Sequence, residues 1–128
     1  MATFSEDYRN AACDLFGDRL NNGHLLVYTG SSPGPDNAAT GTLLFDITLP
    51  ADAMAAASSG SCVMAGSWST TAAADGTAGY FRFTESDTTV VNDGTVGLSG
   101  ADLNMSTLTI ASGGTITATA FTHSQPAS

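Results

Sequence analysis

The sequence has no lysine and very little positive charge of any kind. Three arginines (Arg9, Arg19 and Arg82) stand against twelve acidic residues, which gives a formal net charge of −9. A nucleic-acid-binding protein gains affinity by neutralising phosphates with lysine and arginine, so this composition argues against a nucleic-acid partner. An anionic membrane surface is disfavoured for the same reason.

Long apolar runs and a secretory signal pattern are also missing. No apolar stretch approaches the roughly 20 residues that a membrane-spanning helix requires. Glu6 and Asp7 stand where a signal peptide would carry a positive segment followed by an apolar one. We therefore expect synthesis and folding in a cytoplasm. Cys13 and Cys62 lack a metal-ligand spacing, and in that compartment free buried thiols are expected rather than a disulfide.

What the chain does contain is threonine, glycine and alanine, with a charged fraction of only 12%. This is about half the usual charged fraction, and it is typical of short strands joined by small-residue turns. A length of 128 residues corresponds to one domain, which we expect to span residues 1–128.

The N-terminal segment predicts a helix over residues 4–20. Thr3 and Glu6 match a T-x-x-E capping box, with Ser5 as the competing cap. Apolar residues then recur at helical spacing on one face, at Phe4, Tyr8, Ala11, Ala12, Leu15, Phe16 and Leu20. The sequence thus predicts an amphipathic helix that packs on its own sheet or on a neighbouring subunit.

Strands are expected from about residue 24 to residue 122, followed by a polar tail over residues 123–128. Short apolar or alternating segments lie at 24–29, 42–49, 61–69, 77–85, 88–91, 95–97, 103–105, 107–111 and 115–122. Asn92-Asp93-Gly94 and Ser112-Gly113-Gly114 predict two hairpin turns. The pattern favours an all-β fold, an antiparallel two-sheet β-sandwich or jelly roll with the helix at an edge.

Gly30-Ser31-Ser32-Pro33-Gly34 matches the G-x-S-x-G pattern of serine hydrolases. In such enzymes the residue after the serine donates its backbone N–H to the oxyanion, and Pro33 has none. The prolines also argue against the helix that should follow the serine. We therefore expect no catalytic residue here and no enzymatic activity.

Other possible sites carry weak signals, and we expect neither a cofactor nor a metal. His24 and His123 begin and end strands, as sheet-edge histidines do. Arg82, in an aromatic strand, is expected to stack or to pair with an acid. Asp87, Asn92, Asp93 and Asp102 have oxygen ligands that calcium prefers, but without an EF-hand spacing. Trp68, Tyr28 and Tyr80 could form a sugar-stacking platform, although a small β protein needs its aromatic residues in the core.

Three segments together resemble a family of small virion proteins of tailed bacteriophages, of the head decoration (cement) type. They are LLVYTGSSPGPDNAATGTLLFDITL (25–49), GTAGYFRFTESDTTVVNDGTVGLSGADLNM (76–105) and ITATAFTHSQPA (116–127). Proteins of this family are usually encoded beside the major capsid protein. The resemblance implies an all-β protein that binds the capsid exterior and stabilises the assembled shell, without catalytic residues.

The resemblance also implies the partners: the major capsid protein, and further copies of the chain in a dimer or trimer. Candidate contact surfaces are the loop of residues 30–41, the N-terminal helix face and any unpaired edge strand. The residues expected to bind a partner are Ser31, Ser32, Pro33, Pro35, Asp36, Asn37, Phe4 and Tyr8. Two alternatives remain open, another virion component (neck, tail or fibre) and a receptor- or glycan-binding module.

Overall fold

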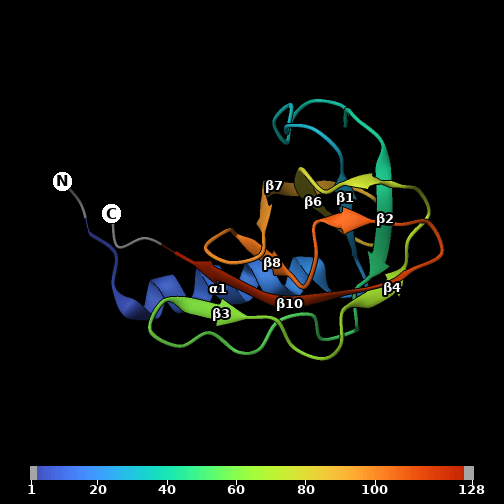
Figure 1. The fold of residues 1–128 in the computed structure, drawn as a ribbon. Coiled ribbons are helices and arrows are strands. Elements are labelled where there is room, and N and C mark those ends of the chain that lie inside the picture. The colour runs from blue at the N-terminus through green and yellow to red at the C-terminus, as the bar shows by residue number, and fades with distance from the viewer. Residues whose placement is uncertain (1–2, 126–128) are drawn as a thin grey trace.

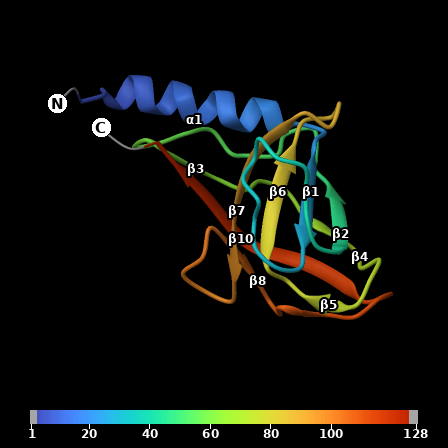
Figure 2. The ribbon, with the colours of Figure 1, turned by 90° about the horizontal axis from the view of Figure 1, so that it is seen from above.

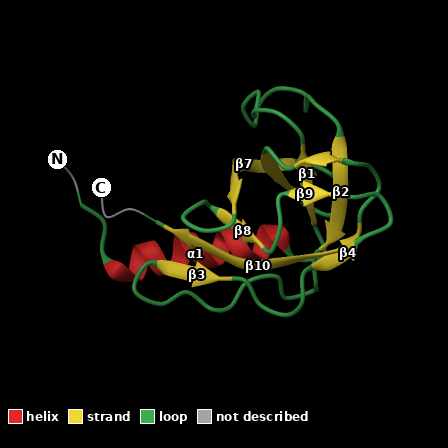
Figure 3. Ribbon diagram, in the orientation of Figure 1, coloured by secondary structure: helices red, strands yellow, loops and turns green. Residues whose placement is uncertain are grey.

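The computed structural model describes residues 3–125, and in this range one helix precedes a series of short strands (Figures 1 and 3). The helix, α1, covers Glu6–Leu20. The strands are β1 (His24–Tyr28), β2 (Leu43–Thr48), β3 (Ser61–Val63), β4 (Ser69–Thr71), β5 (Gly76–Thr77), β6 (Tyr80–Thr84), β7 (Val90–Gly97), β8 (Leu103–Met105), β9 (Thr109–Ile110) and β10 (Thr115–Ser124). The expectation of a mostly β protein with an N-terminal helix is confirmed.

Helix α1 begins later than predicted because Ser5, and not Thr3, is its N-cap. The Ser5 hydroxyl accepts a hydrogen bond from the Tyr8 amide at 3.1 Å, which satisfies one of the free N–H groups of the first turn. Glu6 and Asp7 in the first turn and Arg19 in the last turn complement the helix dipole. The competing cap therefore sets the helix start, and Phe4 lies just before it.

Eight strands form a mixed sheet that curls into a half-barrel (Figure 2). Its strand order is β2-β1-β6-β7-β8-β10-β3, and β4 pairs with the other end of β10. The pairs are antiparallel except β7 with β8, which run parallel, so the expectation of an entirely antiparallel arrangement is wrong at that pair. Strands β5 and β9 form a separate two-stranded sheet.

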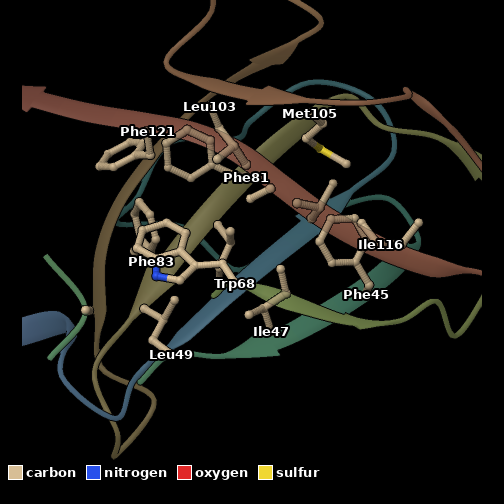
Figure 4. Packing of buried hydrophobic residues seen from close by; sticks show 14 of the residues in the cluster. Phe45, Ile47, Leu49, Trp68, Phe81, Phe83, Leu103, Met105, Ile116 and Phe121 are labelled. Atoms are coloured by element: carbon tan, nitrogen blue, oxygen red, sulfur yellow. The ribbon is translucent and has the colours of Figure 1, made fainter. Parts of the chain in front are cut away.

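Aromatic side chains fill the inside of the curled sheet (Figure 4). Phe83 contacts Trp68 and Phe121 edge to face, with ring centroids 5.8 Å and 5.0 Å apart, and Phe81 contacts Phe121 at 5.8 Å. Such edge-to-face pairs are favoured by the ring quadrupoles. Because Phe81 and Phe83 come from β6 and Phe121 from β10, this cluster joins two strands that are not neighbours in the sheet.

Helix α1 packs one side against the sheet, at the end where β3 and β10 meet. Cys13, Gly17 and Leu20 are buried on this side, and the Phe16 ring stacks on the His123 ring of β10 with centroids 4.1 Å apart. A Cβ on Gly17 would lie 3.0 Å from the Met54 Cβ, so glycine permits the close approach at this point.

The expected hairpin at Asn92-Asp93-Gly94 is wrong, because these residues lie within the continuous strand β7. Asp93 pairs with Arg82 across the β6–β7 ladder instead of forming a turn. Gly94 serves packing, since a Cβ there would lie only 2.4 Å from the Phe81 ring. The N-D-G pattern therefore reflects a buried ion pair and a close ring contact.

The second expected hairpin and one expected strand are also wrong in part. A turn does occur at Ser112–Gly114, where the Gly114 amide donates to the Ala111 carbonyl, but β9 pairs with β5 and β10 pairs with β8, β4 and β3. The segment 61–69 divides into β3 and the start of β4, with Gly66 at a φ of 72° between them. That left-handed conformation favours glycine and interrupts the strand.

The C-terminal residues differ from the expected polar tail. His123 and Ser124 belong to β10, where they pair with Cys62 and Ser61 of β3. The Gln125 amide donates to the Gly60 carbonyl at 2.9 Å. Residues 126–128 of the expected tail lie outside the described residues.

The two cysteines are free and buried, as the sequence predicts. The Cys13 thiol donates to the Gly60 carbonyl at 3.1 Å, and the Cys62 thiol lies 3.6 Å from the Cys13 carbonyl oxygen. Burial, together with the neighbouring Cys13, raises the pKa of the Cys62 thiol to about 12. Cys62 is therefore a neutral packing group at neutral pH rather than a reactive thiolate.

We predict that stability falls with pH below about 6.5 because of His123. Burial lowers the pKa of His123, so folding favours the neutral imidazole. This contribution is fully present above the ordinary histidine pKa of about 6.5, and it is lost as the pH falls towards the lower pKa of the folded state. His123→Phe retains a ring against Phe16 but cannot titrate. Urea unfolding between pH 5 and pH 8 should show a smaller loss for this variant, and equal losses would contradict the assignment.

Candidate functional site

The outer face of the curled sheet carries a buried ion pair between β6 and β7. The Arg82 Nε donates to Asp93 Oδ1 at 2.7 Å, and Nη2 donates to Asp93 Oδ2 at 3.0 Å. The side chains are only 5% and 4% exposed. The sequence led us to expect that Arg82 would stack or would pair with an acid, and the structure shows the second of these. Such a two-point pair satisfies the planar guanidinium and carboxylate together, which a buried pair requires.

The ion pair holds both groups in their charged forms. Burial by itself would raise the pKa of Asp93, but hydrogen bonds from Arg82 and Ser32 and the Arg82 charge outweigh this and lower it. The hydrogen bond to Asp93 raises the pKa of Arg82 against the opposing effect of burial. The pair is therefore ionised throughout the neutral range.

The loop of residues 30–41 folds over this ion pair. Arg82 Nη2 also donates to the Gly34 carbonyl at 3.0 Å, and the Ser32 hydroxyl donates to Asp93 Oδ2. Further along, the Tyr80 hydroxyl donates to the Thr40 carbonyl at 2.7 Å and accepts from the Thr40 amide at 3.1 Å. The loop is thus held at both ends by side chains of the central strands.

The predicted loop residues have different roles. Ser32 is an internal anchor, because its hydroxyl also accepts from the Gly34 amide at 3.0 Å. Pro33 is half-buried, and its carbonyl accepts from the Asn37 amide group at 2.7 Å. Ser31, Ser32, Pro35, Asp36 and Asn37 are exposed, and of these only Ser32 has its side chain bonded to Asp93.

Ser32 has no hydrolase-like geometry in the described structure. Its hydroxyl contacts the Asp93 carboxylate, which is already neutralised by Arg82, and its backbone continues into Pro33. The histidines are placed elsewhere: His24 Nδ1 lies 2.8 Å from Asp46 Oδ1, and His123 stacks on Phe16 under the helix.

Three of the four candidate calcium-binding side chains are used in turns and ladders, and the fourth, Asn92, has a buried Oδ1 without a hydrogen-bond partner among the described residues. The Asp87 carboxylate accepts from the Thr89 amide at 3.0 Å, and the Asp102 carboxylate accepts from the Thr95 amide at 3.1 Å. Asp93 is committed to Arg82. Among residues 3–125, no group of three or more His, Cys, Asp or Glu side chains is placed to hold a metal ion.

The proposed aromatic platform does not assemble on the surface. Trp68 is fully buried, with its indole N–H donating to the Ala65 carbonyl at 3.1 Å, and Tyr80 is buried as well. Both are core residues, which is the plainer of the two sequence interpretations. Tyr28 is only half-buried, and its ring stacks on that of Tyr80 with centroids 5.2 Å apart.

Helix α1 carries a second apolar face, which points away from the sheet. Phe4, Tyr8 and Leu15 are 41%, 52% and 57% exposed, and Ala11 between them is also exposed. Tyr8, Ala11 and Leu15 share one helix face, because positions three and four apart lie on the same side, and Phe4 just before the helix packs on Tyr8. We call Phe4, Tyr8, Ala11 and Leu15 the outer stripe. The predicted pair Phe4 and Tyr8 lies at its start, with ring centroids 4.7 Å apart.

The sequence pattern did not separate the two faces of this helix. Its apolar residues occupy opposite sides, with Cys13, Gly17 and Leu20 buried beneath and the outer stripe above. Leu15 is the residue that sequence reasoning missed as a surface residue. The number of apolar residues in the predicted helix could have indicated this, because it is larger than one helix face can bury.

Comparisons of the chain with family models, with curated proteins and with solved structures find no match. None of the helices in the described range is long and apolar enough to span a membrane.

We predict that Asp93→Asn destabilises the protein by about 3–5 kcal/mol, because it leaves the Arg82 charge buried without its counter-charge. The matched control is Asp46→Asn, which changes the exposed partner of His24 and should cost at most about 1 kcal/mol. Urea unfolding measures both, and hydrogen exchange should show faster opening of residues 30–41 in Asp93→Asn alone. Equal losses in the two variants would show that the Arg82–Asp93 pair is not sealed from water.

Proposed function

We propose that this protein is a structural virion protein that binds the exterior of a phage capsid and stabilises the assembled shell. The proposal rests on the resemblance in residues 25–49, 76–105 and 116–127, and its main structural support is the outer stripe of α1. The partner is the major capsid protein. The site of action is the virion exterior, after synthesis in the host cytoplasm.

The outer stripe has the character of a protein-binding surface. It contains two adjacent aromatic rings, a residue type that is enriched in interfaces, and a leucine that adds apolar area. Figure 2 shows α1, β3 and the end of β10 extending to one side of the curled sheet, so the stripe is open to a large partner.

Charge favours a different protein, rather than a second copy, on this stripe. Asp7 and Asp18 lie exposed on the same helix, its exposed Arg19 is paired with Glu85, and each chain carries a net charge of −9. Two copies facing each other here would repel, whereas basic residues on a capsid surface would complement the acids. The dimer or trimer implied by the resemblance would then use other surfaces. The two end strands are partly covered, since the Leu44 carbonyl of β2 accepts from the Ala73 amide and the Val63 carbonyl of β3 accepts from the Ala55 amide.

The anchored loop offers a second contact surface. Ser31, Pro35, Asp36 and Asn37 are exposed, while Ser32, Gly34 and Thr40 tie the loop to β6 and β7. A loop already held in one conformation loses little entropy on docking. This supports the loop as a partner surface whose contacts come from its outer residues only.

Stabilisation would follow from mass action. A protein that binds the assembled shell and not the free subunits shifts the equilibrium towards the shell by its differential affinity. Many identical weak contacts over a closed lattice add through multivalency. The function therefore requires an exposed binding surface on a stable scaffold, and no chemistry.

We also propose a relation between the observed half-barrel and the two-sheet β-sandwich expected from the sequence. The Ala73 amide of the segment after β4 donates to the Leu44 carbonyl of β2 at 2.8 Å, so the curled sheet returns towards its own edge. We regard the half-barrel as a variant of the two-sheet β-sandwich, or jelly roll, that the resemblance implies.

We predict that Leu15→Ser weakens binding to the capsid about tenfold or more, because it removes an apolar anchor from the outer stripe. Leu98→Ser is the matched control, since Leu98 is similarly exposed at 62% but lies outside the helix. Both variants should keep their stability within about 0.5 kcal/mol. Co-sedimentation with particles assembled from the major capsid protein of the same phage measures the affinities.

The copy number in purified virions tests the proposal as a whole. A decoration protein should be present in a number of copies comparable to that of the major capsid protein. A handful of copies per virion would instead indicate a neck, tail or fibre component. Equal binding by Leu15→Ser and Leu98→Ser would show that the stripe is not the contact surface.

A further inference from the structure

The outer stripe is bordered on one side by a row of acidic residues. Asp7 precedes Ala11 by four positions and Asp14 follows it by three, so both share a helix face with the middle of the stripe. Asp18 continues the row four positions after Asp14. All three aspartates are exposed. We call Asp7, Asp14 and Asp18 the acidic row.

The segment of residues 53–57 runs beside this border and extends it. The Ala57 amide donates to Asp14 Oδ1 at 2.8 Å, and Figure 2 shows the segment in green next to α1. Asp52, which immediately precedes the segment, lines one hollow together with Asp14 and Asp18, with a volume of about 340 Å³. A fourth carboxylate therefore lies at the C-terminal end of the acidic row.

The chain supplies no cation to these four carboxylates within residues 3–125. The ion pairs of this range are Arg19 with Glu85, His24 with Asp46, and Arg82 with Asp93. The acidic row and Asp52 therefore carry negative charge along one side of the stripe that no basic side chain of the described range compensates. A partner with basic residues at this side would relieve their mutual repulsion.

The opposite border of the stripe has a different character. Ala12 and Arg19 occupy it, four positions after Tyr8 and Leu15 respectively. The Arg19 guanidinium lies 3.7 Å from the Glu85 carboxylate, so this border carries little net charge. The stripe thus has one acidic side and one nearly neutral side. A complementary partner carries its basic residues on one side of its apolar surface only.

The partner element must also satisfy its own backbone. The stripe offers side chains but no free backbone groups, because the backbone of a helix is hydrogen-bonded within itself. A strand laid on it would bury N–H and C=O groups without partners, whereas a helix bonds these groups internally. Ala11 is small and lies between Tyr8 and Leu15, which leaves room for a side chain of a second helix. A helix is therefore the element that fits.

We propose that the outer stripe binds an amphipathic helix of the major capsid protein whose lysine or arginine residues face the acidic row. The identity of the partner rests on the proposed function, whereas the kind of element and its charge follow from α1 itself. Apolar contact on the stripe supplies affinity, and the acidic row fixes the orientation of the bound helix and speeds its encounter. A second copy of α1 lacks the required charge, since it presents acids.

Two synthetic helical peptides test the charge requirement directly. They have identical leucine and alanine positions, and the side of this apolar surface carries lysine in one peptide and glutamate in the other. Titrated into the ¹⁵N-labelled protein at about 0.05 M salt, the lysine peptide should bind at least about tenfold more tightly, with amide shifts confined to α1 and residues 52–57. The preference should shrink at about 0.5 M salt, because exposed charges are then screened.

A pair of double variants locates the charge effect. Asp7→Asn/Asp18→Asn removes two charges of the acidic row and leaves Asp14 in place, and it should weaken binding of the lysine peptide about fivefold, since each exposed charge contributes modestly. The matched control Asp46→Asn/Asp87→Asn removes two charges from β2 and from the turn before β7, and it should bind as the wild type does. Asparagine keeps a hydrogen-bond acceptor at both control positions.

Capsid particles of the same phage separate this proposal from the proposed function. Co-sedimentation of the wild type should weaken with salt, and Asp7→Asn/Asp18→Asn should reduce it while the control variant does not. Absence of any co-sedimentation by the wild type would refute the proposed function, and with it the capsid protein as the source of the helix. Co-sedimentation that is equal for the two double variants would leave the function standing and overturn the basic helix.

Two further results would overturn the proposal. One is binding of the glutamate peptide that equals or exceeds binding of the lysine peptide at low salt. The other is self-association of the free protein, seen as a sedimentation coefficient that rises with concentration and that Leu15→Ser returns to the monomer value. That result would identify a second copy of the chain as the occupant of the outer stripe.

Discussion

The arrangement of the outer face depends on the buried pair of Arg82 and Asp93. A guanidinium and a carboxylate that are about 95% shielded from water must stay together, because either one alone would be an unpaired buried charge. The pair keeps β7 extended through Asn92-Asp93-Gly94 beside β6. It also supplies the donor for Gly34 and the acceptor for Ser32, which hold the loop of residues 30–41 over the sheet.

The molecule presents two surfaces with different characters. The anchored loop covers one part of the outer face, where the Arg82 charge is already compensated by Asp93. Helix α1 buries Cys13, Gly17 and Leu20 on one side and leaves the outer stripe uncovered on the other. An apolar stripe on a stable scaffold suits a protein partner.

The sequence-based predictions were wrong at residues whose conformation or exposure is set by contacts with distant segments. Asn92-Asp93-Gly94 is a strong hairpin signal. In the structure, however, Asp93 is hydrogen-bonded to Arg82, eleven residues earlier, and Gly94 lies against the Phe81 ring. Leu15 fits the periodicity of a buried helix face, yet the sheet covers only the opposite side. Local propensity contains no information about a residue that packs from another strand. Here such residues determined the local conformation and the exposed helix face.

The sequence by itself determined the helix near the N-terminus, the predominance of strands, the burial of Trp68 and both cysteines, and the pairing of Arg82 with an acid. These follow from composition, from periodicity and from the cost of leaving an arginine unpaired in an aromatic strand. Only the tertiary structure decided which acid that is, how the strands pair and which helix face remains exposed. Those outcomes depend on contacts between distant segments, and the free energy of such contacts is set by burial and register after the chain has curled.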